Sequence, residues 1–432
     1  MSISDRTNHN DRPEINEAET TGDILVVTRE TIVLEDTTIL EDTTVAEDAK
    51  TLEDMKQRLC AMFHQNGREI SEVVKRKLVL HFDVNKTIVP VDSATGETVE
   101  AALNIYLSGM AWGKDREGVW HSSRHEPSSR PLDATDVSFY KFEEKRLLPQ
   151  KSKDRAALRY HLTSFTDHPQ GTTFKPYLNT LLDTLKWKLP YDESLHKEMT
   201  VPGTKSSRFH FILPSFYTLL NYLIQEERDF TVVFRTYGSD AKGVLKSIKA
   251  TIGSNMPFCH NLESLLEGFS EEVPILRRGE DFGTFRFLSE CEDSCEKSEE
   301  CENCENVKND NEMYNYFSSR NGISAIRDDC EDWYKHGFDP TRGKPLWIDQ
   351  SDPSTHHIFF DDNIRPGNAD SIVNVRVRES SGDFRNVSMA EEYNYVNTNI
   401  VPVVFSEAIL NNDYYIKKLK LCEDNYSKVL ML

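Results

Sequence analysis

The fold is decided by Lys77-Leu-Val-Leu-His-Phe-Asp-Val-Asn-Lys-Thr87, in which a short, mainly apolar run ends in Asp83. Runs that are apolar at nearly every position are typical of strands buried on both faces in a parallel sheet. The run therefore predicts a central β-strand with Asp83 at its carboxyl end. Because ligands of open parallel sheets bind beyond the carboxyl ends of the strands, Asp83 is the first candidate for a functional residue.

Two later apolar runs predict strands of the same kind, Phe230-Thr-Val-Val-Phe-Arg-Thr236 and His357-Ile-Phe-Phe-Asp361. Apolar residues recur at helical spacing before and after the first of these runs, and we expect Pro214-Ser215 and Ser239 to begin the two helices. Weaker candidate strands lie at residues 274–276, 285–287, 372–377 and 400–404. This alternation predicts an α/β fold with a doubly wound, mainly parallel, Rossmann-like sheet.

The first 53 residues differ in character from the rest of the chain. Residues 1–53 are polar and acidic, and Glu-Asp pairs recur with a six-residue period from Glu35 to Glu53. A period of six fits neither an α-helix nor a coiled coil, so we expect a disordered acidic tail. A solubilising role is the expected one, and a docking segment for a basic protein partner is the alternative.

An α/β core is expected over residues 54–410, followed by a C-terminal helix over 411–432. Residues 90–210 interrupt the alternation of strands and helices and predict a large cap-type insertion, which carries an amphipathic helix with four leucines between Leu178 and Leu185. Residues 289–315 are acidic and contain almost no apolar residues, so we expect a disordered surface loop there. The core is therefore predicted to be one domain with two interruptions.

The acidic loop contains four cysteines with the spacing C-x₃-C-x₅-C-x₂-C, which are Cys291, Cys295, Cys301 and Cys304. This pattern includes one zinc half-site, but its middle spacer is much shorter than in zinc ribbons and fingers. We expect reduced thiols, with a metal site as the alternative.

Composition narrows the classes of partner. The chain of 432 residues has a formal net charge of −21, which disfavours binding to nucleic acid or to anionic membranes. It contains no apolar run of about 18 residues, and the first ten residues lack the apolar stretch of a signal peptide. We expect a cytoplasmic protein without nucleic-acid or membrane partners, with the nucleus as the alternative compartment.

The residues at the ends of the three strong strands form a chemical pattern. The strands end in Asp83, in Thr236 and in the pair Asp361-Asp362. Carboxylates and hydroxyls are hard oxygen ligands that suit Mg²⁺ together with substrate phosphate oxygens. A carboxylate beside Mg²⁺ can attack phosphorus and form an aspartyl-phosphate, so the pattern favours phosphoryl-transfer chemistry.

In order and spacing, these stretches resemble the motifs of the haloacid-dehalogenase-like (HAD-like) hydrolase superfamily, of which the chain would be a divergent branch. Asp83-Val-Asn-Lys-Thr87 resembles the first motif, Asp-x-Asp-x-Thr, and Thr236 ends the strand that resembles the second. Lys344 in Arg-Gly-Lys-Pro resembles the third motif, with Lys242, Arg277 and Arg278 as alternatives. The strand that ends in Asp361-Asp362 resembles the fourth.

The resemblance implies a role for each matching residue. It implies that Asp83 is the nucleophile and a metal ligand, and that Thr236, Lys344 and Thr87 bind the phosphate. Two further metal ligands are implied at Asp361 and Asp362. The implied cofactor is Mg²⁺, and the implied substrate is a phosphorylated metabolite or phosphoprotein.

Asn85 departs from the family pattern, in which the second acid of the first motif stands at this position. Asn85 keeps the backbone carbonyl that binds the metal, but an amide cannot act as general acid or base, a contribution worth about 10²- to 10⁴-fold. The expected function is a Mg²⁺-dependent phosphatase or phosphotransferase that acts through an aspartyl-phosphate. The alternative is a catalytically impaired pseudoenzyme that serves as a regulatory or protein-interaction module.

Overall fold

The structure, a computed structural model, describes residues 75–93, 95–148, 156–254, 256, 258, 262–279, 283–289, 307–368 and 371–430. All of these belong to one compact unit, Glu72–Leu432. The predicted acidic tail 1–53 and the four cysteines of the acidic loop lie outside the described residues.

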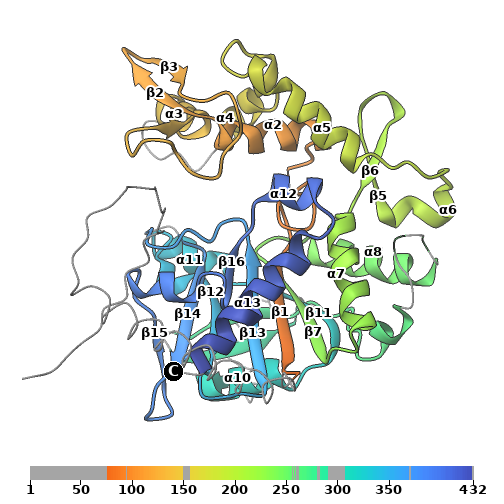
Figure 1. Cartoon of the computed structure of the whole chain (residues 1–432), viewed down its shortest axis with the longest axis vertical. Coiled ribbons are helices and arrows are strands. Elements are labelled where there is room, and N and C mark those ends of the chain that lie inside the picture. Colours follow the sequence, from red (N-terminus) through yellow and green to blue (C-terminus); the bar gives the residue numbers. More distant parts are fainter. Residues whose placement is uncertain are drawn as a thin grey trace, which may run out of the picture. The chain divides into compact units, whose positions relative to one another are not determined.

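The largest sheet has eight strands in the order β10-β9-β8-β11-β7-β1-β13-β16. The pairings from β8 across to β16 are parallel, whereas β9 and β10 add an antiparallel edge. β1 lies between β7 and β13, so the three strands predicted from the apolar runs are neighbours (Figure 1). The strands are β1 Lys77–Asp83, β7 Phe230–Thr236, β8 Ile275–Arg278, β9 Thr284–Leu288, β10 Val307–Asn309, β11 Gly322–Asp328, β13 Thr355–Asp361 and β16 Ile400–Pro402.

Both faces of this sheet are covered. Leu80 and Phe82 of β1 belong to the largest apolar cluster together with residues of α7, α8 and α13, whereas Val79 packs on the other face with residues of α10. This two-sided burial explains why β1 is apolar at nearly every position. The helices of this part of the chain are α7 Pro214–Gln225, α8 Ala241–Gly253, α10 Asp310–Ser318, α11 Cys330–Lys335, α12 Phe405–Leu410 and α13 Tyr414–Leu430.

A smaller sheet in the order β12-β14-β15 packs beside β13. Its strands are β12 Lys344–Ile348, β14 Val373–Arg378 and β15 Phe384–Asn386, and β12 and β14 are parallel. Trp347 of β12 joins the apolar cluster beneath β1, so this sheet is part of the same core.

The predicted insertion, residues 90–210, forms elements outside the main sheet (Figure 1, orange to yellow-green). They include a three-stranded sheet β3-β2-β4 and a hairpin of β5 and β6. Tyr106 joins this segment to the core, because its hydroxyl group lies 3.1 Å from the hydroxyl of Ser406. The elements are α2 Val99–Met110, β2 Trp112–Arg116, β3 Val119–Ser122, β4 Val137–Ser138, α3 Phe139–Leu147, α4 Ala156–Leu162, α5 Lys175–Leu185, α6 Glu193–His196, β5 Thr200–Pro202 and β6 Arg208–His210.

The mixed α/β class and the mainly parallel large sheet are thus confirmed. The antiparallel edge and the strands β11 and β12 were not predicted. β11 has the sequence Gly-Ile-Ser-Ala-Ile-Arg-Asp, and β12 begins with Lys344-Pro345, so neither presents a continuous apolar run. No helix in the described part of the chain has the length and apolar character needed to span a bilayer.

The predicted start of α7 at Pro214-Ser215 is confirmed, whereas α8 begins one residue later than predicted. The Ser215 hydroxyl donates a hydrogen bond to the carbonyl of Ala408 instead of capping α7, which begins with Pro214 in its first turn. α8 has Asp240 rather than Ser239 at its N-cap, and the Asp240 carboxylate bonds to groups outside the helix. In α8, tertiary contacts therefore occupy the carboxylate that could otherwise have capped the helix.

The end of the predicted acidic loop is also wrong, because residues 307–315 form β10 and the start of α10. A capping box begins this helix: the Asn309 side chain accepts from Glu312 N, and the Glu312 carboxylate accepts from Asn309 N. Met313 and Tyr314 then bury one face of the helix. Asp310 and Glu312 lie in the first turn of α10, where negative charge stabilises a helix.

Three buried histidines lie on the two central strands, His81 on β1 and His356 and His357 on β13. Burial lowers the pKa of His356 and of His357 to about 3, and burial also lowers the pKa of His81 well below its usual value. His356 Nε2 donates to the carbonyl of Thr398 at 2.8 Å, so this nitrogen carries the hydrogen of the neutral ring. These side chains are therefore neutral parts of the core.

We expect the free energy of unfolding to decrease as the pH falls from about 6.5 toward 3, because the unfolded chain then binds protons that the buried imidazoles cannot accept. His356 and His357 each contribute up to about 1.4 kcal/mol per pH unit in this window. His356→Gln keeps a donor for Thr398 but cannot titrate, so urea titrations of this variant should give a shallower pH dependence than the wild type. An unchanged slope would contradict this assignment.

Candidate functional site

The site begins in the loop that follows β1. The amides of Ile88 and Val89 both donate to the carbonyl of Val84 at 3.0 Å, which folds the chain back tightly behind Asp83. Thr87 is thereby placed beside the strand end, and its hydroxyl donates to Asp83 Oδ2 at 3.2 Å. Tyr415 of α13 secures the loop from outside, since its hydroxyl donates to the carbonyl of Thr87 at 2.5 Å. The C-terminal helix therefore supports the strand end that carries the candidate nucleophile.

Lys344 stands between two of the predicted carboxylates. Its Nζ lies 2.5 Å from Asp83 Oδ1 and 2.8 Å from Asp361 Oδ2. The Lys344 side chain is only 1% exposed, so the ammonium group is buried with its two partners. Lys344 belongs to the smaller sheet. It is the first residue of β12, and its backbone amide donates to the carbonyl of Ile372.

A third carboxylate, that of Asp362, completes an acidic cluster. Oxygen atoms of Asp83, Asp361 and Asp362 lie within 4.8 Å of one another. An octahedral Mg²⁺ with oxygens at about 2.1 Å holds neighbouring ligands about 3 Å apart and opposite ones about 4 Å apart, so small side-chain movements would bring this set onto one ion. The three residues could therefore hold a divalent cation.

The charges of the cluster are only partly balanced. Burial is the main cause that raises the pKa of Asp83 well above its usual value; Lys344 opposes this shift, and Asp361 and Asp362 add to it. Burial and the adjacent Asp361 also raise the pKa of Asp362 to about 7. Burial acts to lower the pKa of Lys344, but Asp361 and Asp83 together outweigh it and raise this pKa above its usual value, so the lysine stays charged. One ammonium facing three carboxylates leaves an excess of negative charge that a bound cation would neutralise.

Thr236 ends the neighbouring strand β7. Asp83 is opposite Arg235 in the β1–β7 register, so Thr236 extends one residue farther toward the loops. The Thr236 hydroxyl oxygen accepts a hydrogen bond from Gly238 N at 3.1 Å, which leaves its hydrogen to donate to a ligand. This hydroxyl is thus oriented by its own turn.

A buried ion pair lies directly behind these groups. Arg235 Nε and Nη2 donate to the two carboxylate oxygens of Asp328 on β11 at 2.9 and 2.5 Å, and both side chains are at most 1% exposed. Arg235 Nη1 also donates to the carbonyl of Pro345, the residue after Lys344, at 3.2 Å. One guanidinium group therefore ties β7 to β11 and to the strand that delivers Lys344.

Asn85, which replaces the expected second acid, has an acidic partner. Its side-chain amide donates to Asp240 Oδ2 at 2.9 Å, and Asp240 Oδ1 accepts from Ser93 N at 3.1 Å. Asp240 is 4% exposed and lies four residues after Thr236, at the start of α8. The carboxylate of Asp240 is therefore hydrogen-bonded directly to the side chain at position 85.

The structure brings Asp83, Thr87, Lys344, Asp361 and Asp362 into one cluster, with Thr236 at the end of the adjoining strand β7 and Asn85 in the loop after β1. The alternatives to Lys344 lie elsewhere: Lys242 is exposed on α8, Arg277 pairs with Asp329, and Arg278 contacts Asn374 and the carbonyl of Gly343. Three residues of the site were not predicted, namely Arg235, Asp328 and Asp240. Only Arg235 had a visible signal, because an arginine inside a buried apolar run requires a buried partner.

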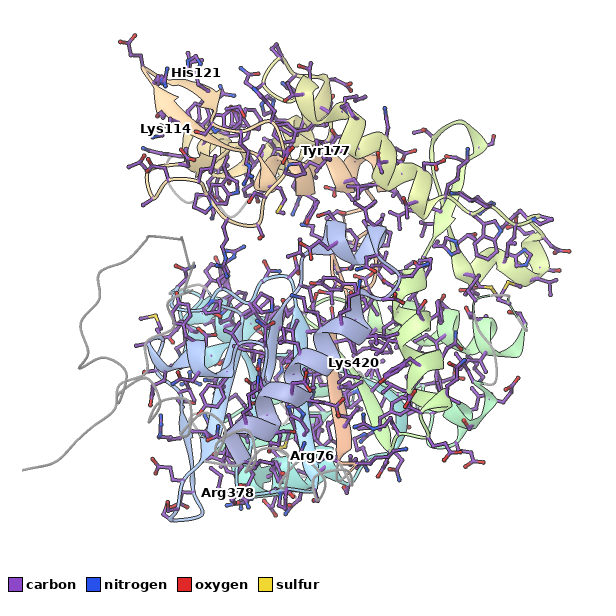
Figure 2. All side chains as sticks on the ribbon, viewed as in Figure 1. Arg76, Lys114, His121, Tyr177, Arg378 and Lys420 are labelled. Carbon is purple, nitrogen blue, oxygen red and sulfur yellow. The ribbon has the colours of Figure 1, made fainter. Side chains whose placement is uncertain are left out.

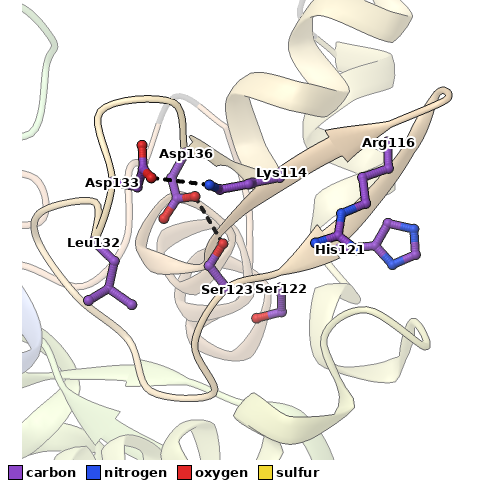
Figure 3. Close-up of a pocket in the computed structure, with 8 residues that line it drawn as sticks. All are labelled: Lys114, Arg116, His121, Ser122, Ser123, Leu132, Asp133 and Asp136. Atoms are coloured by element: carbon purple, nitrogen blue, oxygen red, sulfur yellow. Dashed lines mark hydrogen bonds and ion pairs between the residues drawn. The ribbon is translucent and has the colours of Figure 1, made fainter.

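A separate polar hollow of about 510 Å³ lies within the insertion (Figure 3). It is lined by Lys114, Arg116, His121, Ser122, Ser123, Leu132, Asp133 and Asp136. Figure 2 shows Lys114 and His121 on the β2–β3 hairpin. Two contacts stay inside the hollow, Lys114 with Asp133 at 3.2 Å and Ser123 with Asp136 at 2.9 Å. None of its lining residues belongs to the cluster around Asp83, so the hollow is not part of that site.

We expect Lys344→Met to lower the free energy of unfolding by about 3–5 kcal/mol, because the substitution leaves two buried carboxylates without their counter-charge. Urea denaturation in the presence of EDTA measures this decrease with no divalent ion bound to the carboxylates. Lys242→Met, on the exposed face of α8, is the matched control and should change stability by less than about 0.5 kcal/mol. Equal effects of the two substitutions would show that the Lys344 ion pairs do not stabilise the fold.

Chemically, the site combines a buried carboxylate at a strand end, a cation that contacts it, further carboxylates that could hold a metal, and an oriented hydroxyl. Comparisons of the chain with known protein families, with curated proteins and with solved structures found no match. The function is therefore inferred from the chemistry of these side chains.

Proposed function

We propose that the protein is a Mg²⁺-dependent phosphatase or phosphotransferase that works through a phosphoryl group on Asp83. The observation that carries this proposal is the position of Asp83, at the end of a central parallel strand with Lys344 at 2.5 Å and two more carboxylates beside it. A buried carboxylate with a fixed cation and a possible metal is a suitable nucleophile for phosphorus. The substrate would be a phosphorylated metabolite or a phosphoprotein.

Each side chain has a distinct task in this reaction. Asp83 would attack phosphorus through one oxygen while its other oxygen stays bonded to Lys344. Lys344 and Thr236 would hold oxygens of the transferring phosphoryl group, and Thr87 keeps the nucleophile oriented. Asp83, Asp361 and Asp362 would hold Mg²⁺, which when bound supplies screening of the negative charge of the phosphoryl group.

The proposal includes the finer features of the fold. We interpret the mainly parallel sheet, with β1 between β7 and β13, as the doubly wound, Rossmann-like core of a divergent HAD-like protein, with residues 90–210 as a cap-type insertion. The support is the order of four side chains along the sequence, in which Asp83, Thr236, Lys344 and Asp361 follow one another as the four motifs require. Lys344 contacts both Asp83 and Asp361 at the carboxyl ends of β1 and β13, and Thr236 ends the neighbouring strand β7.

Asn85 favours a second candidate function. Without an acid at this position, the protein could bind a phosphorylated ligand with little turnover and act as a regulatory module. The two candidates differ in turnover but share the metal and phosphate groups, so direct assays of hydrolysis separate them.

We expect the purified protein to hydrolyse at least some members of a panel of phosphate esters in the presence of Mg²⁺, and EDTA to abolish this activity. Asp83→Asn keeps the size of the side chain but removes the nucleophile, so turnover should fall to background. Lys242→Met serves as a control with wild-type rates. Turnover that survives Asp83→Asn would refute the proposed nucleophile, and a wild type inactive on the whole panel would favour the regulatory candidate.

Mg²⁺ should also stabilise the folded protein, since it binds carboxylates that come together only on folding. At a Mg²⁺ concentration about 100 times Kd, the free energy of unfolding should increase by about 2.7 kcal/mol. Asp361→Asn should remove most of this increase without affecting the response to monovalent salt. The same Mg²⁺ response in both proteins would exclude Asp361 as a metal ligand.

A further inference from the structure

The contacts of Asp240 indicate a role in hydrolysis, which rests on the proposed function. Asp240 approaches the site from a segment that the first motif does not include, the turn between β7 and α8. As the N-cap residue of α8 it would ordinarily bond to the amides of its own helix, but it makes no side-chain cap bond. Its two carboxylate oxygens instead bind the Asn85 side chain and the amide of Ser93. The carboxylate is therefore held toward the loop that follows Asp83.

The bond between the two side chains fixes the orientation of the Asn85 amide. An ionised carboxylate only accepts hydrogen bonds, so the Asn85 group that faces Asp240 must be the NH₂ group. The other end, Asn85 Oδ1, is buried and has no hydrogen-bond partner within the described part of the chain. A buried carbonyl without a partner is costly, and a ligand or water molecule in the site would satisfy it.

Asp240 also lies close to the phosphate-binding hydroxyl that we propose. A Cβ atom added to Gly238 would be 3.5 Å from Asp240 Oδ2 and 3.8 Å from Thr236 Oγ1. The two oxygens therefore border the same small space, which glycine leaves open. Asp240 Oδ2 can accept a second hydrogen bond there in addition to the one from Asn85.

We propose that Asp240 is the general base of the second half-reaction and replaces the acid that is missing at position 85. A water oxygen bonds to phosphorus while the bond between phosphorus and the Asp83 oxygen breaks. The water gives one proton to Asp240 Oδ2, and Asp83 is released as a carboxylate together with inorganic phosphate. Asn85 Oδ1 accepts a hydrogen bond from the same water and orients it.

The test is pre-steady-state hydrolysis of p-nitrophenyl phosphate with Mg²⁺, in which the first half-reaction releases p-nitrophenolate, a leaving group that needs no acid. Asp240→Asn should keep a burst of about one p-nitrophenolate per protein, while the following steady-state rate should decrease by about 10²- to 10⁴-fold. The substitution retains an oxygen for Ser93 N, and a flip of the Asn85 amide preserves the other bond, so the fold should persist.

Exchange of the two side chains provides the matched control. In Asn85→Asp/Asp240→Asn the amide and carboxylate trade places, the hydrogen bond between them remains, and the base moves to the position that the family pattern expects. The steady-state rate of this double variant should recover to within about tenfold of the wild type, a rescue that a purely structural role of Asp240 does not predict.

Three results would overturn the inference. A wild-type steady-state rate in folded Asp240→Asn would show that Asp240 takes no proton, while the function proposed for Asp83 would stand. Equal losses of burst and steady-state rate without rescue by the exchange would assign Asp240 a structural role only. The absence of both burst and turnover in the wild type would refute the proposed function, and the inference with it.

Discussion

The architecture of the site depends on the buried contact of one ammonium group, that of Lys344, with the carboxylates of Asp83 and Asp361. These two carboxylates stand at the ends of adjacent parallel strands, where like charges in a dry environment would repel each other strongly. The lysine comes from β12 of the smaller sheet, so the charge balance of the site requires the two sheets to stay together. The Arg235–Asp328 pair supports this arrangement, because the same guanidinium group also binds the carbonyl next to Lys344.

The strands that could be predicted from sequence are those that are buried along their whole length. β1, β7 and β13 are apolar at nearly every position, and the residues that end them form the site. β11 could not be recognised from sequence, since Ser324 interrupts its short apolar stretch and the strand ends in Arg327-Asp328. Lys344 was found only through its resemblance to a motif, because a lysine followed by proline gives no local sign of a buried strand. Asp240 was missed because its partner is 155 residues away in sequence.

The position of Asp240 alters the conclusion drawn from Asn85, which stands where the first motif of the family has its second acid. Sequence alone shows an amide at position 85 and predicts impaired hydrolysis. The structure shows that the amide is one member of a hydrogen-bonded pair whose other member is a carboxylate beside the turn after Thr236. In the family pattern, one aspartate at position 85 would bind the metal through its backbone carbonyl and also move a proton. In our proposal, Asn85 keeps the first task and Asp240 performs the second.

The proposed function requires covalent chemistry at Asp83. The most direct measurement is mass spectrometry of the protein quenched in acid after brief exposure to a phosphate ester and Mg²⁺, with the phosphoryl group located within the sequence. We expect one phosphoryl group on the peptide that contains Asp83, labile at alkaline pH as an acyl phosphate is, and greater occupancy in Asp240→Asn. Turnover accompanied by no modification of Asp83, or by modification of another residue, would contradict the proposed function.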